Sequence, residues 1–441
     1  MVTFDSHAVG TRASAWEAAI AALPPIDFTS VTEVVVVAAH PDDESLGAGG
    51  LISEFAARGI PVRVIIVTDG AASHPRSPTT SSGERAAVRR EEAATAVRRL
   101  SAEATLTLLD FPDGEVRENT DAIRAALATS ITGRPLLVST WRSDGHRDHR
   151  IVGELCAEIA NDRGLTLAEY PIWLWHWGAP EADLEGFASM PIGVEALAAK
   201  RSAIHAHESQ VSALSDAEGD EAMLDPAFLE HFYRDREVYL VTTPSLPSTY
   251  FDDLYARHDD PWQFTTRWYE SRKRAITLAS LPDERYGRVL EIGCSIGVLT
   301  ELLAGRADEL VAIDVSETAV ERARARLAGN PSVSVIHVDA EAPLPDGPFD
   351  LIVLSEVGYY FSAPALESLL DQIEDRLGQS GTLVACHWQH TVTDYPQTGA
   401  AVDAAINARG WATIARHVER DFIMDVVSYN DRSVAQSGGL A

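Results

Sequence analysis

Two short clusters of histidine and carboxylate side chains hold the residue types that bind divalent metals. The first cluster, AHPDDE at residues 39–44, directly follows a run of valines, and its His40 and Asp43 are close enough in sequence to converge on one ion. The second cluster, DGHRDH at residues 144–149, follows the apolar segment PLLVST. Two histidines, an aspartate and an open position for water form the ligand set of a catalytic zinc site. A neighbouring carboxylate can take the proton of the activated water.

Each cluster on its own is more typical of a loop whose aspartate caps a helix. Both clusters, however, follow a segment with the pattern of a buried strand, Val34 to Val37 before the first and residues 135–140 before the second. In open α/β sheets, ligands bind outside the carboxyl ends of the strands. The two clusters are therefore predicted to lie at the same edge of one sheet and to form a single site.

Motifs over roughly residues 30–245 resemble the PIG-L/LmbE family of zinc-dependent N-acetylglucosamine deacetylases. They are AHPDDE at 39–44, TDG at 68–70, Arg89-x-x-Glu92, FPDG at 111–114, HRDH at 146–149 and HESQ at 207–210. The resemblance implies that zinc is held by His40, Asp43 and His149. It implies that Asp42 is the general base on the zinc-activated water. It also implies that His146 stabilises the tetrahedral oxyanion or protonates the leaving amine.

Three further residues near these motifs bear on the substrate. Arg89 is expected to hold a sugar hydroxyl or a phosphate, and an i,i+3 salt bridge to Glu92 is the alternative. Arg147 stands where the family usually has proline, which alters the rim of the pocket and leaves the substrate open. Asp148 is expected to orient a histidine instead of binding the metal.

An aromatic segment, PIWLWHWG at residues 171–178, holds three tryptophans around His176. Aromatic faces stack on sugar rings, so the segment could form a carbohydrate platform. A strand with alternating buried tryptophans is the favoured interpretation. Outside this segment, His205 and His207 are expected to be structural or to lie at the pocket rim.

A second unit of chemistry begins at a glycine turn, Glu291-x-Gly293-x-x-x-Gly297, which follows an apolar strand pattern. The glycines allow the backbone to approach a ligand closely, with a helix N-terminus behind them. Asp314 ends the next strand about 20 residues after Gly293, the place from which an acid holds the hydroxyls of a ribose. Asp339 ends a third strand, where an acid can accept a hydrogen bond from an adenine amine. A dinucleotide site would use a similar arrangement.

Motifs over roughly residues 250–441 resemble class I S-adenosylmethionine-dependent methyltransferases, and among them the nodulation protein S type of N-methyltransferase. They are DPW at 260–262, WYESRKR at 268–274, RVLEIGCSIGVLTELLA at 288–304, FDLIVLSEVGYY at 349–360 and GTLVACHWQH at 381–390. The resemblance implies that Glu291, Gly293, Gly297, Asp314 and Asp339 bind the methyl donor. Ser295 stands where many methyltransferases carry a middle glycine, and it is small enough to keep the turn.

The methyl acceptor is expected to lie near the ends of later strands. Methyl transfer from a sulfonium needs mainly in-line positioning and a neutral amine. Four side chains near these strand ends are candidates to bind or deprotonate the acceptor: Glu356, Tyr359, His387 and His390. Trp262 and Trp268 either close over the site or belong to ordinary packing.

Charge and composition exclude several classes of partner. With 36 Lys+Arg against 66 Asp+Glu, the net charge is −30, which argues against nucleic-acid binding and against anionic lipid surfaces. No stretch approaches about 18 uninterrupted apolar residues, so no membrane span is expected. The three cysteines are scattered and the N-terminus lacks the pattern of a secretory signal, so a cytoplasmic protein is expected.

Two segments about 250 residues apart have the pattern of the first strand of an open α/β sheet. They predict two open parallel-sheet α/β domains, both Rossmann-like. Strands are predicted at 61–68 and 135–140, then at 309–315, 333–338, 350–354 and 381–386, and an amphipathic helix at 84–100. The segment 287–297 is predicted to be a strand that runs into the glycine turn. The predicted domains are a helical extension at 1–29, the deacetylase-like domain at 30–245 and the methyltransferase-like domain at 246–441. TTPSLPSTY at residues 242–250 is the predicted linker, and residues 213–227 are predicted to form a mobile loop.

Together, the two resemblances predict a bifunctional enzyme that deacetylates an N-acetylglucosaminyl compound and then N-methylates the exposed amine. Its cofactors would be Zn²⁺ and S-adenosylmethionine, and its substrate a small amino sugar or glycolipid. The acidic surface weakly favours retention of a cationic amino sugar and tells against a strongly anionic phospholipid. Three alternatives remain: uncoupled activities with an unrelated methyl acceptor, a deacetylase regulated by a donor-sensing domain, and a lectin-like binder. The oligomeric state stays open.

Overall fold

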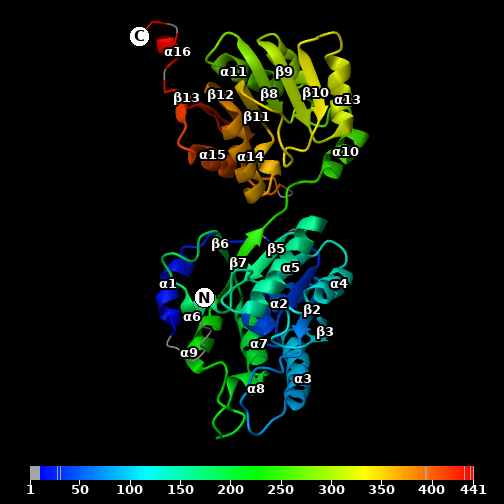
Figure 1. Ribbon diagram of the computed structural model, residues 1–441, viewed down its shortest axis with the longest axis vertical. Coiled ribbons are helices and arrows are strands. Elements are labelled where there is room, and N and C mark those ends of the chain that lie inside the picture. The colour runs from blue at the N-terminus through cyan, green and yellow to red at the C-terminus, as the bar shows by residue number, and fades with distance from the viewer. Residues whose placement is uncertain are drawn as a thin grey trace. The chain divides into compact units, whose positions relative to one another are not determined.

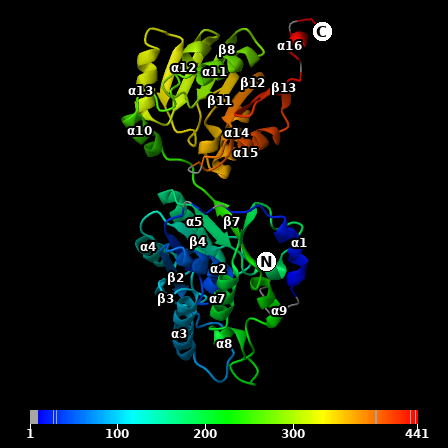
Figure 2. The same ribbon diagram turned by 180° about the vertical axis from the view of Figure 1, so that it is seen from behind.

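The computed structural model describes residues 10–440 except 27, 30, 393, 394, 432 and 438. The chain divides into two compact units, residues 1–243 and 244–441. Each unit is an α/β domain around one seven-stranded sheet (Figures 1 and 2). Among the described residues, no helix is both long and apolar enough to cross a membrane.

The sheet of the first domain has the strand order β3-β2-β1-β4-β5-β7-β6. Its strands are β1 (Val34–Ala38), β2 (Val62–Thr68), β3 (Thr105–Phe111), β4 (Leu136–Thr140), β5 (Leu167–Tyr170), β6 (Phe187–Pro191) and β7 (Arg236–Thr242). The first five strands pair in parallel, whereas β7 runs antiparallel to both β5 and β6. The antiparallel end was not part of the sequence prediction, which expected parallel strands only.

Helices cover both faces of this sheet because its central strand is buried on both sides. Along β1, Val34 and Val36 belong to the core under α2, α3 and α7, whereas Val35 and Val37 belong to the core under α4 and α5. The helices are α1 (Ala13–Ala21), α2 (Asp43–Ala57), α3 (Ser82–Leu100), α4 (Thr120–Ser130), α5 (Arg147–Arg163), α6 (Leu174–Trp177), α7 (Val194–Ile204), α8 (Glu208–Val211) and α9 (Pro226–Leu229). Such a continuous apolar strand is typical of a parallel sheet covered on both faces.

The second sheet has the order β10-β9-β8-β11-β12-β14-β13, which is the same connectivity as the first when strands are counted from the start of each domain. Its strands are β8 (Tyr286–Ile292), β9 (Ala307–Asp314), β10 (Val333–His337), β11 (Phe349–Ser355), β12 (Leu377–Trp388), β13 (Ala412–Val418) and β14 (Phe422–Ser428). Again the strand before the last in spatial order, β14, is antiparallel to its neighbours.

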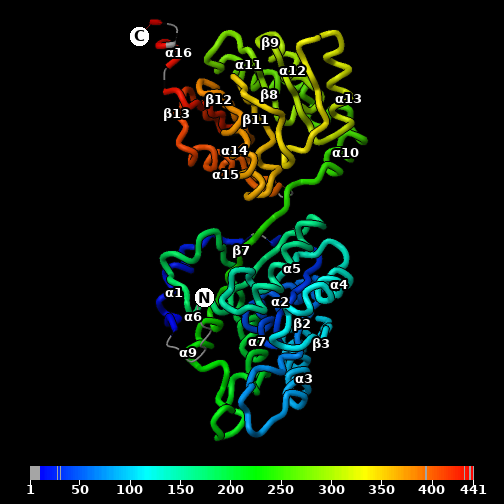
Figure 3. Tube along the Cα trace, viewed as in Figure 1, coloured from blue at the N-terminus to red at the C-terminus, as the bar shows by residue number. Residues whose placement is uncertain are grey.

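Helices of the second domain also lie on both faces of their sheet. They are α10 (Ser248–Arg257), α11 (Trp268–Ser280), α12 (Val298–Ala304), α13 (Glu317–Arg326), α14 (Ala363–Arg376), α15 (Gly399–Asn407) and α16 (Val434–Ser437). Leu370 of α14 and Ile406 of α15 pack in one core, and Leu303 of α12 packs in the other. Figure 3 follows the chain from β7 into α10 through residues 243–247, inside the predicted linker.

Local sequence accounts for several of these boundaries. Ser81 and Glu84 form a reciprocal capping box at the start of α3, and Gly164 ends α5 in the left-handed conformation that glycine adopts without strain. The strands predicted from apolar runs are confirmed to within a few residues. The segment 171–178 is different: residues Leu174–Trp177 form the short helix α6 and not a strand.

Candidate active sites

The first candidate site lies where β1 and β4, which pair in the centre of the sheet, both end. His40 lies two residues beyond β1, Asp43 begins α2, and His149 lies in the first turn of α5 after β4. Their polar atoms converge: His40 Nδ1 is 3.2 Å from His149 Nε2, and Asp43 lies 3.5 Å from His40 Nδ1 and 3.2 Å from His149 Nε2. All three residues are buried.

This donor set fits zinc. Two imidazole nitrogens and a carboxylate are zinc ligands, and ligands about 2.0–2.1 Å from a tetrahedral ion lie about 3.3 Å from one another. The three separations between His40, Asp43 and His149 are close to that value. His40 Nδ1 and His149 Nε2 lie 3.2 Å apart. A cation bound beside them would accept the lone pair of each nitrogen. The predicted ligands are therefore brought together, and all three line one cavity.

Carboxylates lie next to the outer ring nitrogen of each candidate histidine ligand. His149 Nδ1 is 2.7 Å from Asp144 Oδ2, and Asp144 is itself anchored by the backbone N–H groups of Trp173 and Leu174. His40 Nε2 lies 3.1 Å from Asp113 and 3.5 Å from Asp148. Such partners orient metal-binding imidazoles. Asp148 thus contacts a histidine, as predicted, but Asp144 and Asp113 make the shorter contacts.

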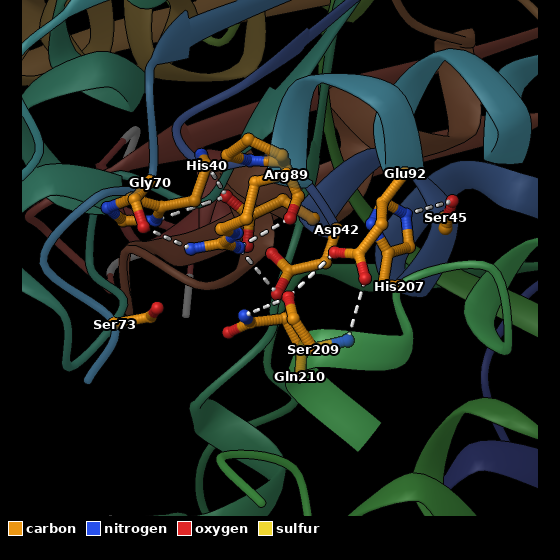
Figure 4. A network of polar contacts seen from close by, with 12 residues as sticks. His40, Asp42, Ser45, Gly70, Ser73, Arg89, Glu92, His207, Ser209 and Gln210 are labelled. Atoms are coloured by element: carbon orange, nitrogen blue, oxygen red, sulfur yellow. Dashed lines mark hydrogen bonds and ion pairs between the residues drawn. The ribbon is translucent and has the colours of Figure 1, made fainter. Parts of the chain in front are cut away.

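Asp42 lies next to this triad in a strained backbone conformation. Its φ is 144°, a region that side chains other than glycine rarely adopt. Arg89 of α3 donates to the Asp42 carboxylate at 3.0 Å and to the carbonyl oxygens of Pro41 and Gly70 (Figure 4). Burial raises the pKa of Asp42 to about 6, although the Arg89 charge opposes this shift. A carboxylate of that pKa is suited to accept a proton near neutrality.

The sequence predicted that Arg89 binds a sugar group or Glu92, and it did not predict the contact with Asp42. The ion pair that Arg89 makes is with Asp42, whereas Glu92 accepts hydrogen bonds from the backbone and hydroxyl of Ser209. The alternative of an Arg89–Glu92 bridge is wrong. Arg89 also lines the cavity, so the predicted contact with a sugar group stays a prediction.

Glu44 and His207 support the Asp42 turn from behind. Glu44 accepts a hydrogen bond from the Asp42 backbone N–H at 3.1 Å and from Ser45 Oγ at 2.7 Å. His207 Nε2 lies 3.2 Å from Glu44 Oε1 and 3.2 Å from Ser45 Oγ (Figure 4). This buried network explains the last acid of AHPDDE and the histidine of HESQ, and it confirms the structural role predicted for His207.

His146 is half-buried at the N-terminus of α5, with ring centroids 4.8 Å from His40 and 4.7 Å from His149. Its Nδ1 accepts a hydrogen bond from the Asp148 backbone N–H at 3.3 Å. Burial and the two neighbouring histidines hold the pKa of His146 well below its usual value. A ring that accepts a hydrogen bond at Nδ1 carries its proton on Nε2, where it can donate a hydrogen bond.

A cavity of about 920 Å³ opens onto these residues. Its rim includes Arg147, as predicted, together with the loop after β2 and the loop at 212–225. These two loops are joined by hydrogen bonds from Thr79 Oγ1 to Asp220 and between His74 and the Glu221 carbonyl. The segment predicted to be a mobile loop therefore forms part of the cavity wall.

The aromatic segment contributes mainly to the core, as the favoured interpretation held. Trp173 touches the cavity but is only 7% exposed. Its ring stacks on Trp177 at 5.4 Å and on Phe228 at 4.6 Å between centroids. Because protein rings already cover Trp173, it is not a free platform for a sugar.

The second candidate site lies at the carboxyl end of β8, around the predicted glycine turn. Gly293 and Gly297 have φ values of 78° and 77°, and a Cβ at Gly293 would come within 2.2 Å of Val357. Ser295 adopts a φ of 51°, and its hydroxyl bonds to Tyr255 OH at 2.5 Å. The departure from glycine therefore keeps the left-handed turn and adds a hydrogen bond.

Two of the predicted acids, Asp314 and Asp339, line a cavity of about 320 Å³ next to the glycine turn. Asp314 accepts backbone N–H hydrogen bonds from Ser295 at 2.8 Å and from Ser316 at 2.9 Å, which leaves lone pairs for two hydroxyls. Asp339 is exposed at the cavity edge, two residues beyond β10. Glu291 does not line this cavity; it is buried and lines a smaller neighbouring pocket, and burial raises the pKa of Glu291 to about 8.

A buried ion-pair cluster forms the other side of this cavity. Lys273 Nζ lies 2.7 Å from Glu356 and 3.2 Å from Glu270, and Tyr359 OH donates to Glu356 at 2.5 Å. Burial lowers the pKa of Lys273, but the two glutamates outweigh it and the net shift is upward. Glu356 itself has a φ of 61°, a strained conformation of the kind that clusters at functional sites.

The other predicted acceptor residues lie elsewhere. His387 is buried, its Nε2 accepts from the Gly358 backbone N–H at 3.1 Å, and burial lowers its pKa to about 4; this contact supports the turn that carries Tyr359. His390 pairs with Asp421 at 2.8 Å. Trp262 lines the cavity, whereas Trp268 is 76% exposed.

Sequence reasoning missed four side chains of these sites as individual residues: Asp113, Asp144, Glu270 and Lys273. Each lies inside a motif that was noticed, FPDG, DGHRDH or WYESRKR. The partners of Asp113, Asp144 and Lys273 lie on other elements, whereas Glu270 pairs with Lys273 three residues away on the same helix. Only the folded arrangement could assign them.

Comparison with known proteins follows this division. The model of the family described as GlcNAc-PI de-N-acetylase matches residues 35–160, and the model for nodulation protein S (NodS) matches residues 252–402. Diacetylchitobiose deacetylase of Thermococcus kodakarensis is 32% identical over 142 residues, which are 31% of this chain and 52% of that protein.

The second domain matches several nodulation proteins S. That of Sinorhizobium fredii is 30% identical over 159 residues, 36% of this chain and 67% of the relative. That of Bradyrhizobium diazoefficiens is 37% identical over 103 residues, 23% of this chain, so the chain spans 49% of that relative's length. The solved structure of N-methyltransferase NodS from Bradyrhizobium japonicum WM9 with S-adenosyl-L-homocysteine is 23% identical, covers 41% of this chain and 98% of its own, and has a TM-score of 0.39.

The chain thus belongs, through residues 252–402, to the nodulation protein S family, and its residues 35–160 match the model of the GlcNAc-PI de-N-acetylase family.

Proposed function

We propose that this protein is a bifunctional enzyme that removes the acetyl group from an N-acetylglucosaminyl substrate and then N-methylates the exposed amine. The observation that carries the proposal is the convergence of His40, Asp43 and His149 within 3.5 Å, with Asp42 beside them. A methyl-donor cradle on the same chain supports the second step. The substrate class is a small amino sugar or glycolipid.

For the first step, His40, Asp43 and His149 would hold zinc. When bound, zinc supplies a Lewis acid that polarises the acetamide carbonyl and makes water acidic enough to react. Asp42 takes the proton of the attacking water and returns it to the leaving nitrogen as the C–N bond breaks. Arg89 keeps the Asp42 carboxylate in place through its 3.0 Å hydrogen bond.

His146 completes the first step as a donor to the developing oxyanion. Its Nδ1 is occupied by the Asp148 backbone N–H, so the proton lies on Nε2. Of the two roles that the resemblance implied, this arrangement supports oxyanion stabilisation over protonation of the amine, because a ring that accepts at Nδ1 is not an imidazolium. Oxyanion donors of this kind contribute about 10²–10³-fold to rate.

For the second step, Glu291, Gly293, Gly297, Asp314 and Asp339 would bind S-adenosylmethionine, which supplies the electrophilic methyl group. The chain's own part is to hold the acceptor amine in line and unprotonated. The acceptor would bind at the Lys273–Glu356–Tyr359 cluster, which lines the same cavity. His387 acts on this site through the turn that it supports.

The test is a product analysis with two variants. The full chain with zinc and S-adenosylmethionine is incubated with a panel of N-acetylglucosaminides, and products are followed by mass spectrometry. We expect loss of 42 mass units, about one acetyl group, before gain of about 14 for one methyl. Asp42→Asn should block both products, whereas Asp314→Ala should block only the second.

Other outcomes would favour other functions. Methyl uptake by Asp42→Asn on the acetylated substrate would show that the activities are uncoupled. Loss of deacetylation in Asp314→Ala would favour a donor-sensing role for the second domain. Acetate release retained by Asp42→Asn would remove the assignment of the base.

A further inference from the structure

We propose that Glu270 of α11 is the general base of the methyl-transfer site and takes a proton from the protonated acceptor amine before the methyl group moves. The inference rests on the second step of the proposed function and adds a catalytic residue to it. Nothing in the local sequence singles out Glu270. In the structure, however, it lines the cavity of about 320 Å³ together with Lys273 and Glu356.

The cluster around Lys273 holds more negative than positive charge. Lys273 Nζ lies 3.2 Å from Glu270 and 2.7 Å from Glu356, and all three side chains are at most 14% exposed. Arg267, the other cation among the described residues that line this cavity, is exposed and donates to Gln263. A buried carboxylate without a counter-charge is unfavourable. A cationic amine that enters the cavity would balance the second carboxylate.

Three donors already occupy the carboxylate of Glu356. Lys273 Nζ lies 2.7 Å from Oε1, and the Tyr359 hydroxyl and the Trp388 backbone N–H lie 2.5 Å and 3.2 Å from Oε2. Because a carboxylate has about four lone-pair sites, little of Glu356 is left to take a proton from a substrate. These contacts fit a positioning role, in which Glu356 fixes the wall of the cavity.

Glu270 is much less occupied. Among the residues that the structure describes, its one side-chain hydrogen bond is from Lys273 Nζ to Oε1 at 3.2 Å. Burial raises the pKa of Glu270, Lys273 and Arg274 oppose this shift, and Glu356 adds to it. A carboxylate whose pKa is raised accepts a proton more readily near neutrality. Glu270 therefore combines a free oxygen with the basicity that the step needs.

The other titratable groups near this cluster fit the role less well. Against burial, which lowers it, the two glutamates raise the pKa of Lys273 and keep it an ammonium. The Tyr359 hydroxyl already donates to a glutamate. His387 and His390 are not among the residues that line the cavity. Of the described groups that touch Lys273, Glu270 is thus the one placed to accept a substrate proton.

The proton transfer prepares the amine for the methyl group. The acceptor enters as an ammonium, which has no lone pair with which to attack. Glu270 takes one N–H proton, and the freed lone pair then forms the N–C bond to the methyl carbon while the bond from that carbon to the donor sulfur breaks. The products are S-adenosylhomocysteine and a methylated ammonium. The proton on Glu270 passes to solvent before the next turnover.

The test uses acceptors that already carry a free amine, so it does not depend on deacetylation. The full chain with S-adenosylmethionine is given glucosamine or its disaccharide, and kcat is measured from about pH 6 to about pH 9, across the pKa of about 8 that such an amine has. Glu270→Gln should lower kcat about 100-fold at the acid end and less than about fivefold at the alkaline end. At high pH the amine is already unprotonated and no base is needed.

Two further variants separate this role from a structural one. Glu356→Gln should lower kcat by about the same factor at every pH, because it disturbs the position of the cavity wall. The matched control is Glu321→Gln, an exposed change on α13, which should behave like the unmodified chain. Calorimetry should show that Glu270→Gln binds S-adenosylhomocysteine within about threefold of the unmodified chain.

A deficit of Glu270→Gln that is equal at all pH values would overturn the inference, and so would unchanged kcat at the acid end. A large loss of S-adenosylhomocysteine affinity with an unchanged pH profile would place Glu270 in the donor site instead.

Binding separates this inference from the proposed function. If the unmodified chain methylates neither amine, the proposed methyl transfer fails, and calorimetry in the presence of S-adenosylhomocysteine then compares glucosamine with the neutral N-acetylglucosamine. Tighter binding of glucosamine that is lost in Glu270→Gln supports the contact of Glu270 with the amine. Equal binding of the two sugars, or a preference that Glu270→Gln keeps, refutes it.

Discussion

The turn after the first strand of each sheet is constructed differently in the two domains. The turn after β1 forms its site with side chains. His40 Nδ1 and the Asp43 carboxylate lie 3.5 Å apart. After β8 the turn presents backbone, and Gly293 leaves no room for a side chain because a Cβ would meet Val357 at 2.2 Å. The same strand order places both turns at the centre of the sheet.

The fourth strand of each domain extends the comparison. The segment after β4 supplies Asp144, His146 and His149, and the segment after β11 supplies Glu356 and Tyr359. In both sheets the fourth strand lies beside the first, so each domain collects its reactive groups from the same two strand ends. The fold therefore provides the position of a site, and the residue types at those two ends decide whether it takes a metal or an organic cofactor.

The largest effect is expected on the rate of deacetylation, from a change in the turn after β1. Asp42→Asn should reduce deacetylation by about 10²–10⁴-fold, because an amide cannot accept the proton of the attacking water. Methylation of a free-amine acceptor should stay unchanged. Acetate release and methyl incorporation measure the two activities in the same preparation.

Asp162→Asn, an exposed change on α5, is the matched control for Asp42→Asn and should behave like the unmodified chain. A variant at Asp42 that keeps more than a third of the activity would show that another group is the base.

The second prediction addresses the backbone turn. Gly293→Ala should weaken binding of S-adenosylhomocysteine by about 100-fold, because the added Cβ meets a stiff β-branched side chain at 2.2 Å in a left-handed conformation. Calorimetry on the full chain measures this affinity. Deacetylation should be unaffected.

Gly329→Ala controls for the backbone strain alone. Gly329 has a φ of 92° but no atom within 4 Å of a Cβ, so this variant should lose stability and keep its affinity. Equal loss of affinity in both variants would mean that strain, and not close approach, explains the glycine at 293.

The third prediction tests how the metal-binding side chains are held. Asp144→Asn should weaken zinc binding about 10–100-fold, because the imidazole of His149 loses the carboxylate that orients it at 2.7 Å. Competition with a chromophoric chelator measures zinc affinity. Unchanged affinity in a folded variant would remove Asp144 from the site.

The smallest effect is expected at Ser295, which stands where many methyltransferases carry a glycine. Ser295→Gly relieves a φ of 51° but removes the hydrogen bond to Tyr255. These changes oppose each other, so donor affinity should stay within about threefold. A larger loss, measured by the same calorimetry, would show that the serine hydroxyl contributes directly to the donor site.

Much of both sites could be predicted from local sequence. The strand at Val34–Val37 is a continuous apolar run, and the strand at Val289–Ile292 is apolar apart from Glu291. The residues at the ends of both strands have types and spacings with few other uses. What local pattern could not assign were partners distant in the chain. Arg89 pairs with Asp42, 47 residues away, and Lys273 pairs with Glu356, 83 residues away. The antiparallel last strands were missed for the same reason, because their pairing is non-local.

The sequence by itself determined that there are two α/β domains and which side chains and glycines would form their reactive turns, because strand periodicity and residue chemistry are local properties. The tertiary structure alone decided that Asp113 contacts His40, that His387 supports a turn, and that exposed arginines line one cavity of an acidic chain. Those properties depend on which distant side chains meet when the strands assemble, and on where each charge lies relative to solvent.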